Sequence, residues 1–305
     1  MFTLAHLTDL HLGPLPQASS WRDYLGKRTI GAISWHRYRR FHHDAAISLA
    51  MTADIRAAGP DHVALTGDLV NIALAAEFIV AAKWLKDFGP PGWITVVPGN
   101  HDAYVNFPWA NGAGLWADYM TGDMNVPGAR QKGNIAAVFP FVRQRKNIAL
   151  IGVSSAVPQA YHRAGGRLGS LQLTHLAEIL RDLRERGYYR VVLIHHPPIP
   201  GLTPKRRELE DAAGLKAVLE GEGAELVLHG HNHHHSRVTL ASRHGPVHIL
   251  GLPSASTPVK RSDDPAAWSL YRIHRQNGGW QATATVRSWD NEAKRFVEHE
   301  MFDLS

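Results

Sequence analysis

The sequence WITVVPGNHD, residues 93–102, joins an apolar run to a cluster of polar residues. Its first half, Trp93–Val97, is a short apolar run typical of a buried strand. Its second half, Pro98–Asp102, places an amide, an imidazole and a carboxylate after a glycine that lets the backbone turn sharply. In open α/β sheets the carboxyl ends of the strands line the ligand crevice. This junction therefore predicts an α/β fold with a binding site at that edge.

Four other strand-like runs end in polar residues in the same way, so the five junctions can converge at one edge. Side chains at i and i+2 of an extended chain point to the same side. We therefore expect Asp9 and His11 to share one ion, and His231 and His233 to face one site. The other junctions are Phe2–Thr8 before Asp9-Leu10-His11, His62–Thr66 before Gly67-Asp68, Val191–Ile194 before His195-His196-Pro197-Pro198, and Leu226–Leu228 before His229-Gly230-His231-Asn232-His233.

The donor types at these junctions predict a metal site. Taken singly, most of the junctions are explained by turn chemistry, and His195-His196 before two prolines also fits a rigid loop. Five such junctions in order are not explained by turns alone. Imidazole, carboxylate and amide groups without thiolate suit divalent ions such as Mn, Fe, Co or Zn. The chain has no cysteine, which excludes disulfides, thiolate ligands and a cysteine nucleophile.

Helical patterns alternate with strands, including Ile148–Val153, up to His235. After it, short runs separated by turn residues predict antiparallel strands. This order favours layered sheets flanked by helices. Because the site residues run from Asp9 to His233, we expect one domain over residues 1–305. The predicted helices are Ala45–Ala58, Leu74–Phe88, a stripe over Leu173–Leu183 that ends at Gly187, and a weaker one from about Arg206 to Leu219; the late strands are Val238–Leu240, Val247–Leu250, Trp268–Ile273 and Trp280–Val286.

The composition is that of an ordinary globular protein with a net positive charge. Of its 305 residues, 44% are hydrophobic and 20% charged, and the net charge of +6 suits anionic partners. Met1–Leu12 has no signal-peptide pattern, and the apolar stretch Ile72–Trp84 is interrupted by charges and too short to span a bilayer. We expect a cytoplasmic protein, with peripheral contact to the membrane left open.

The five junctions together resemble the calcineurin-like metallophosphoesterase superfamily. The matching blocks are Asp9/His11, Gly67-Asp68, Gly99–Asp102, His195 and Gly230–His233, and the resemblance covers roughly residues 1–255. It implies a four-layer α/β/β/α sandwich. The forms HHPP and GHNH are most similar to the branch with bacterial class III cyclic-nucleotide phosphodiesterases and glycerophosphodiesterases. The sequence departs from the family pattern at Asn71, where many relatives carry an aspartate, and in the long segment Pro14–His43.

Carried over residue by residue, the resemblance implies two divalent metal ions. One would be bound by Asp9, His11, Asp68 and His233, and the other by Asp68, Asn100, His195 and His231, with Asp68 bridging. His195 is preferred to His196 because it follows the strand directly. His101 would be a catalytic residue that lies beside the scissile phosphate without binding metal.

The function implied is hydrolysis of a phosphate ester by direct attack of a hydroxide that bridges the metals. Two divalent ions, two carboxylates and a hydroxide leave the site near +1, which attracts an anionic substrate. A small or lipid-linked phosphodiester is the preferred substrate. A phosphomonoesterase and a nucleotide-lipid pyrophosphohydrolase are the alternatives. A DNA nuclease is less favoured because no nucleic-acid module is evident. A metal-bound scaffold is the non-enzymatic alternative, although such relatives often lose a ligand that is present here.

The segment WRDYLGKRTIGAISWHRYRRFHH, residues 21–43, mixes basic and aromatic residues directly after the first junction. It fits either a solvated basic helix packed on the domain or a cap over the metal site. As a cap, its mixture of Arg, Trp and Tyr suits anionic lipid headgroups or a partly apolar phosphate ester. We therefore predict that Arg37, Arg39 and Arg40 contact the substrate.

Overall fold

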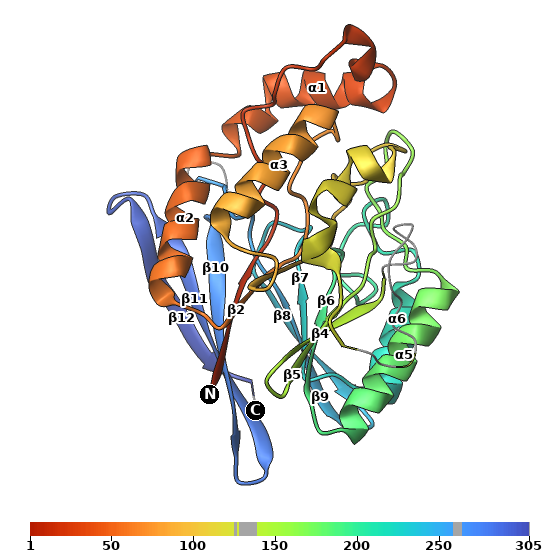
Figure 1. Ribbon diagram of the computed structural model, residues 1–305, viewed down its shortest axis with the longest axis vertical. Coiled ribbons are helices and arrows are strands. Elements are labelled where there is room, and N and C mark those ends of the chain that lie inside the picture. Colours follow the sequence, from red (N-terminus) through yellow and green to blue (C-terminus); the bar gives the residue numbers. More distant parts are fainter. Residues whose placement is uncertain (125–126, 128–138, 259–263, 305) are drawn as a thin grey trace.

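Two six-stranded β-sheets face each other in the computed structural model, and helices cover the outer face of each sheet (Figure 1). The structure describes residues 1–124, 127, 139–258 and 264–304. Helices α2 (Ala45–Ala58) and α3 (Ala75–Phe88) lie outside the first sheet. Helices α5 (Ser170–Glu185) and α6 (Ala212–Glu222) lie outside the second. This arrangement confirms the four-layer α/β/β/α sandwich.

The first sheet combines strands from both ends of the chain. Strand β1 pairs with β2 in parallel and with β10 in the antiparallel sense, and β2 pairs with β3 in parallel. The carboxyl ends of β1, β2 and β3 therefore meet at one edge. The strand order is β12 (Arg295–Asp303), β11 (Gly279–Asp290), β10 (Ala267–Gln276), β1 (Phe2–Leu7), β2 (His62–Leu65) and β3 (Ile94–Val96).

The second sheet is parallel at its centre. Strands β5, β6, β7 and β9 run in parallel, whereas β4 and β8 are antiparallel edge strands. The carboxyl ends of β6 and β7 therefore lie together. The strand order is β4 (Phe141–Arg145), β5 (Ile148–Gly152), β6 (Tyr189–Leu193), β7 (Leu226–His229), β9 (Gly245–Gly251) and β8 (Ser236–Ser242).

The central strands of the second sheet are buried on both faces, which explains their continuous apolar sequences. Ile148 and Leu150 of β5 belong to a core that also contains residues of the first sheet. Ala149 and Ile151 belong to a second core with residues of α5 and α6. Because alternate residues of a strand point to opposite faces, a one-residue slip would exchange the two sets. Burial on both faces therefore fixes the register and holds the strand ends in place.

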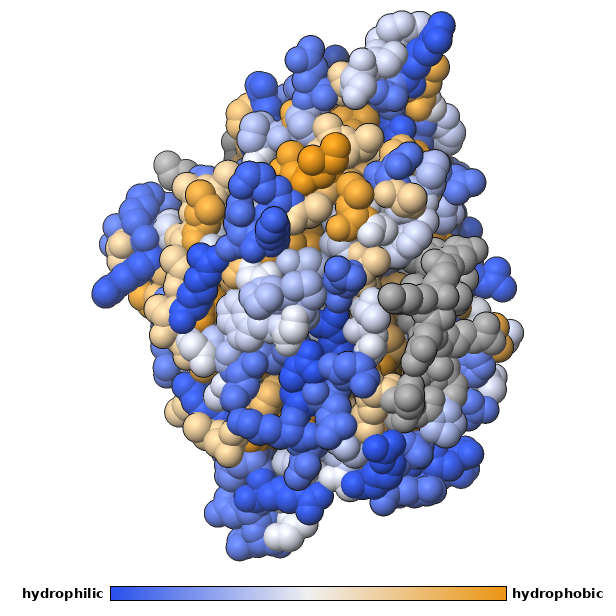
Figure 2. All heavy atoms as spheres, in the orientation of Figure 1, coloured by the Kyte–Doolittle hydropathy of each residue, from blue (hydrophilic) through white to orange (hydrophobic). Residues whose placement is uncertain are grey.

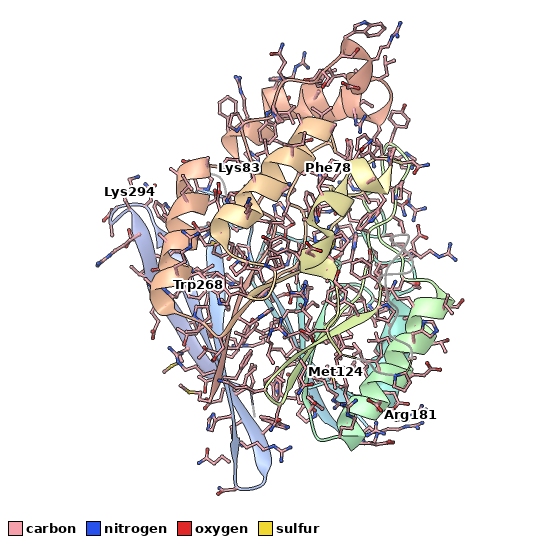
Figure 3. All side chains as sticks on the ribbon, in the orientation of Figure 1. Phe78, Lys83, Met124, Arg181, Trp268 and Lys294 are labelled. Carbon is pink, nitrogen blue, oxygen red and sulfur yellow. The ribbon has the colours of Figure 1, made fainter. Side chains whose placement is uncertain are left out.

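Helix α2 begins and ends where the sequence predicts. The Asp44 side chain accepts a hydrogen bond from the Ala46 backbone N–H at 2.8 Å, and Gly59 adopts a left-handed φ of 59° at the other end. Trp268 of β10, labelled in Figure 3, donates its indole N–H to Asp54 of α2 at 2.9 Å. This hydrogen bond attaches the helix to the first sheet.

Four elements differ from the sequence-based expectation. Helix α6 begins at Ala212 rather than near Arg206, because Asp211 accepts hydrogen bonds from the backbone N–H groups of Leu168 and Gly169 and holds the preceding residues in a loop. Strands β4 and β12 were not predicted, because charged and exposed residues interrupt their apolar pattern. Strand β9 is antiparallel to β8 as expected, but it is also parallel to β7.

The basic aromatic segment folds into three short helices above the edge where the strands end (Figure 1). Arg28 anchors it by donating to the backbone carbonyls of Ile72 and Ala73. Trp35 is buried. The helices are η1 (Trp21–Tyr24), α1 (Lys27–Arg37) and η2 (Arg39–Phe41), and the other short helices among the described residues are η3 (Trp109–Asn111) and η4 (Ala113–Met120). Within the described ranges, no helix has the length and apolar character needed to cross a membrane.

Candidate metal centre

The junction residues adopt left-handed backbone conformations rather than extended ones. The φ angles are 53° at Asp9, 42° at His11, 55° at Asp68, 71° at His231 and 58° at His233. The expectation that Asp9 and His11, and His231 and His233, point the same way because the chain is extended was therefore wrong. A residue other than glycine rarely adopts a positive φ without strain, and such strain concentrates at functional sites. The turns still bring these side chains to a common site.

Asp9, His11 and His233 form one group of donors. His233 Nε2 lies 3.1 Å from Asp9 Oδ1 and 3.3 Å from His11 Nε2. The other Asp9 oxygen accepts hydrogen bonds from Thr8 Oγ1 at 2.7 Å and from the backbone N–H of His231 at 2.9 Å. The donor atoms of the group lie within 4.8 Å of one another, so they could hold a metal ion.

Asn100, His195 and His231 form a second group. Asn100 Oδ1 lies 3.1 Å from His195 Nε2 and 2.8 Å from His231 Nδ1. The two imidazole nitrogens are 3.3 Å apart. One ring from the loop after β6, one from the loop after β7 and an amide from the loop after β3 therefore meet across the two sheets.

Asp68 lies between the two groups. Its Oδ2 is 3.7 Å from His11 Nε2 and 3.4 Å from His195 Nε2, while its Oδ1 accepts a hydrogen bond from the backbone N–H of His101 at 2.7 Å. Gly67 makes this position accessible: its φ is 95°, and a Cβ there would lie 2.5 Å from the backbone nitrogen of Gly99. Only glycine fits such a close approach.

Backbone carbonyls orient three of the four histidines in these groups. His11 Nδ1 lies 3.3 Å from the Val70 oxygen, His195 Nδ1 lies 2.7 Å from the Thr66 oxygen, and His231 Nε2 lies 3.0 Å from the Arg207 oxygen. A carbonyl accepts but cannot donate, so each of these nitrogens carries the proton. In the neutral form of each ring, the opposite nitrogen then has a free lone pair toward the site, which is the arrangement found in metal-binding histidines.

The ring nitrogens of His196 contact different groups from those of His195. Its Nε2 lies 3.2 Å from the Ala164 oxygen and its Nδ1 lies 2.7 Å from Ser155 Oγ. Its ring centroid is 4.4 Å from that of His231, and His196 belongs to one of the groups that could hold a metal. Because both of its nitrogens contact groups outside the predicted ligand set, His196 fits a supporting position better than a ligand position.

His101 lies beside both donor groups but is oriented by different contacts. Its Nδ1 contacts the Asn71 carbonyl, and its Nε2 lies 3.2 Å from Nη2 of Arg39. The ring of Tyr104 stacks on His101 at a centroid distance of 5.5 Å. Burial and the positive charge of Arg39 together lower the pKa of His101 to about 4. His101 is therefore neutral here and accepts from Arg39.

The sequence alone did not reveal the structural role of Asp102, although this residue belongs to the quoted motif. Its carboxylate accepts hydrogen bonds from the backbone N–H groups of Gly99, Asp68, Leu69 and Val70. Burial and the nearby Asp68 carboxylate together raise the pKa of Asp102 to about 7. Asp102 thus ties the loops after β2 and β3 together. Its position in the motif could have marked Asp102 as a candidate site residue, but the hydrogen bonds that define its role form only in the folded chain.

The carboxylates of Asp9 and Asp68 are ionised in spite of their burial. Burial by itself would raise their pKa values. The surrounding imidazoles, His233 beside Asp9 and His195 beside Asp68, outweigh this effect and hold both pKa values below the ordinary range. Two buried carboxylates that remain charged suit cationic ligands.

A cavity of about 630 Å³ opens over the two groups. Its walls include Lys27 and Arg39 of the basic segment and Arg207 of the loop before α6. Arg39 thus lies at the site, whereas Arg37 and Arg40 are exposed and do not line this cavity. The two donor groups together contain six of the seven predicted ligands, and the seventh, Asp68, lies between the groups. The predicted metal ligands that line the cavity are His11, Asp68, Asn100, His231 and His233.

Solved structures share this fold. A dimetal phosphatase from Danio rerio aligns with 100% of this chain and 98% of its own, at a TM-score of 0.62 and 13% identity. A purple acid phosphatase from yellow lupin (Lupinus luteus) seeds aligns with 99% of this chain and 53% of its own, at a TM-score of 0.54 and 12% identity. At these identities the likeness shows the fold alone.

Comparison with protein families and curated proteins identifies the class. A curated protein from Synechococcus, a probable cyclic nucleotide phosphodiesterase, is 24% identical over 288 residues, which is 92% of this chain and 90% of the relative. The profile of the calcineurin-like phosphoesterase family matches residues 2–235. The fold and the family match define a metal-dependent hydrolase of phosphate esters. Within that class, the chain belongs to the calcineurin-like phosphoesterase family.

Proposed function

We propose that the chain is a phosphodiesterase that uses two divalent metal ions to hydrolyse a small or lipid-linked phosphodiester. The observation that carries this proposal is the position of Asp68. Its Oδ2 lies 3.7 Å from a nitrogen of the first donor group and 3.4 Å from a nitrogen of the second. A carboxylate between two sets of donors would suit a pair of divalent ions that share it.

The donor set supports one ion in each group. In the proposal, Asp9, His11, Asp68 and His233 bind the first ion. The second is bound by Asp68 together with Asn100, His195 and His231. The lone pairs left free by the carbonyl contacts of three of these histidines support this assignment. Imidazole with carboxylate and amide oxygen suits Mn, Fe, Zn or Co.

When bound, two such ions supply Lewis acidity that activates water and balances charge on the phosphoryl oxygens. His101 then acts on the leaving group. Its Nδ1 is held by the Asn71 carbonyl, so its Nε2 faces the cavity beside Arg39. A phosphate anion next to this ring raises its pKa, because negative charge favours imidazolium. His101 can then donate a proton to the leaving oxygen.

A diester is favoured over the other phosphate esters by the relatives. Two curated proteins from Synechococcus are named probable cyclic nucleotide phosphodiesterases; one aligns with 92% of this chain, and the other is 33% identical over 122 residues. A monoesterase, a nucleotide-lipid pyrophosphohydrolase and, less favoured, a DNA nuclease would use the same donors. A metal-bound scaffold would need the ions but no His101.

The surface of the basic segment supports a lipid-linked substrate at an anionic membrane. Trp21 is 69% exposed and Tyr38 is 64% exposed, and four further large apolar residues of the segment are also exposed. Figure 2 shows apolar side chains around the upper end of α3, next to α1; Ile79 and Val80 of α3 are exposed. Apolar side chains beside Arg37 and Arg40 suit the headgroup region of a bilayer.

The test is activity and metal dependence across one panel of substrates. The panel contains bis-p-nitrophenyl phosphate, p-nitrophenyl phosphate, cyclic nucleotides, glycerophosphodiesters, a UDP-linked lipid and single-stranded DNA. We expect chelation to abolish diester hydrolysis and Mn²⁺ or a similar ion to restore it. Full activity in rigorously metal-free protein would overturn the proposal. Hydrolysis of monoesters or of the UDP-linked lipid alone would favour the corresponding alternative.

A further inference from the structure

The cavity has a strongly basic wall beside the predicted metal ligands. Its lining contains five Lys and Arg residues, whereas Asp68 is its one Asp or Glu residue among the described residues. Arg163 forms an ion pair with Glu210 at 3.1 Å. Within the described part of the chain, the other four basic residues have no carboxylate within 4.0 Å. These four are Lys27, Arg39, Arg206 and Arg207.

Lys27 and Arg39 each contact one ring of a stacked pair. Arg39 Nη2 lies 3.2 Å from His101 Nε2. The Tyr104 ring stacks on His101 at 5.5 Å, and Lys27 Nζ lies 4.3 Å from the centre of the Tyr104 ring. Lys27 also donates to the Gln159 carbonyl at 3.1 Å. The ammonium group is therefore held at a fixed position, one ring further from the metal centre than His101.

This arrangement of charges is costly without an anion. Burial lowers the pKa of Lys27, and the charge of Arg39 lowers it further. Burial also lowers the pKa of Arg39, and the nearby Arg207 adds to that shift while Tyr104 and Asp68 oppose it. Neighbouring cations in a half-buried wall repel each other and lose hydration. A bound anion would neutralise the charges of Lys27 and Arg39, and the removal of their repulsion would contribute to its affinity.

We infer that Lys27 and Arg39, with Arg206 and Arg207 beside them, form a subsite for a second phosphate group of the substrate. The inference deepens the proposed function and rests on it for the identity of the first phosphate. The hydrolysed phosphate lies at the metal centre beside His101. The second phosphate lies beside Tyr104, between the Lys27 ammonium and the Arg39 guanidinium, and these two cations contact its oxygens. The substrate class is a phosphodiester that carries an additional phosphate a few bonds from the scissile one.

The first experiment compares a matched pair of chromogenic esters on the metal-loaded enzyme. One is thymidine 5′-(p-nitrophenyl phosphate), and the other is the same compound with a 3′-phosphate. We expect the wild type to show a KM for the phosphorylated ester lower by about tenfold or more, the effect of one charge-assisted contact. Lys27→Gln should remove most of this ratio. Lys83→Gln is the control, because Lys83 is 75% exposed on α3 and paired with Asp87 away from the cavity (Figure 3).

The second experiment does not depend on hydrolysis. Metal-free wild type is titrated with inorganic pyrophosphate and with inorganic phosphate by calorimetry, and the titrations are repeated with Lys27→Gln and Arg39→Gln. We expect salt-sensitive binding of pyrophosphate that each of these variants weakens and Lys83→Gln keeps. Equal KM values for the two esters together with no difference among the variants in pyrophosphate binding would overturn the subsite and leave the diesterase proposal intact. Lys27-dependent pyrophosphate binding without diester hydrolysis would support the subsite and reject the proposed function.

Discussion

The carboxylate of Asp102 accepts a hydrogen bond from the backbone N–H of Asp68 at 2.9 Å, so one buried acid fixes the position of another. The same oxygen accepts from Gly99 at 2.8 Å, and the second oxygen accepts from Leu69 and Val70 at 3.0 and 3.2 Å. Four backbone donors from two loops thus depend on a single side chain. The position of Asp68 between the two donor groups rests on this contact.

Replacing Asp102 with asparagine should destabilise the protein and weaken metal binding. The amide keeps one accepting oxygen but turns an NH₂ group toward two buried N–H donors. Each unpaired buried donor costs about 1–3 kcal/mol, so we expect a loss of about 2 kcal/mol or more. Thermal unfolding at a pH above the pKa of Asp102 measures this loss. Asp87→Asn, at a side chain 62% exposed, is the control and should unfold as the wild type does.

Asp68→Ala should lose more metal than Asp9→Ala. In the proposed centre Asp68 serves both ions, whereas Asp9 belongs to the first set only. We expect elemental analysis to give a metal content close to zero for Asp68→Ala and close to one ion per chain for Asp9→Ala. Two tightly bound ions in Asp68→Ala would show that this carboxylate is not the bridge.

The adjacent histidines after β6 should have separable effects. His195 turns Nε2 toward Asn100, so His195→Gln should lose the second ion. Both ring nitrogens of His196 contact Ser155 and Ala164, so His196→Gln should keep two ions and lower the melting temperature instead. Metal content and thermal unfolding measured on the same preparations distinguish the two. The reverse pattern would make His196 the ligand.

His101→Ala should keep both metals and lose about 10²–10⁴ in kcat, the usual range for a positioned acid or base. If His101 protonates the leaving oxygen, the loss should be small for a p-nitrophenol leaving group and large for an alkyl alcohol, which needs the proton. Steady-state kinetics on a pair of diesters that differ only in that group provide the measurement. An equal loss on both would assign His101 to electrostatic stabilisation alone.

The sequence predicted the layers of the fold and the meeting of the five junctions because both depend on local patterns. Apolar runs such as Ile148–Leu150 indicate strands buried on both faces, and a polar motif after such a run lies at the strand's carboxyl end. The predicted ends of helix α2 also match, because the Gly59-Pro60 signal is local.

Details that depend on distant partners could not be predicted in this way. The left-handed turns at Asp9 and His231 are stabilised by contacts across both sheets, and an i, i+2 argument assumes an extended chain. The role of Asp102 depends on N–H groups more than thirty positions away in sequence. The choice between His195 and His196 likewise depends on which carbonyl each ring meets. Lys27 was quoted only as part of a basic segment, because its distance to Tyr104 is a property of the folded chain.

The three arginines predicted together from the sequence should separate into two functions. Arg39 lines the cavity and contacts His101, whereas Arg37 and Arg40 lie on the exposed surface with Trp21, Tyr38 and the other exposed apolar residues of the segment. Arg39→Gln should raise the KM for phosphate-ester substrates and leave vesicle binding intact. The double variant Arg37→Gln/Arg40→Gln should weaken binding to anionic vesicles.

The size of that second effect follows from surface electrostatics. Each Lys or Arg near an anionic surface contributes about 1 kcal/mol, so removing two should weaken binding roughly thirtyfold. Co-sedimentation with vesicles containing phosphatidylserine, at low and high salt, measures it. Arg181→Gln/Arg186→Gln removes the same charge from α5 and the loop after it, where both arginines pair with acidic residues, and should bind as the wild type does. Equal vesicle binding by the two double variants, or no binding of the wild type to anionic vesicles, would contradict this prediction. Arg37 and Arg40 would then be solvated surface residues, and the substrate would reach the cavity from water.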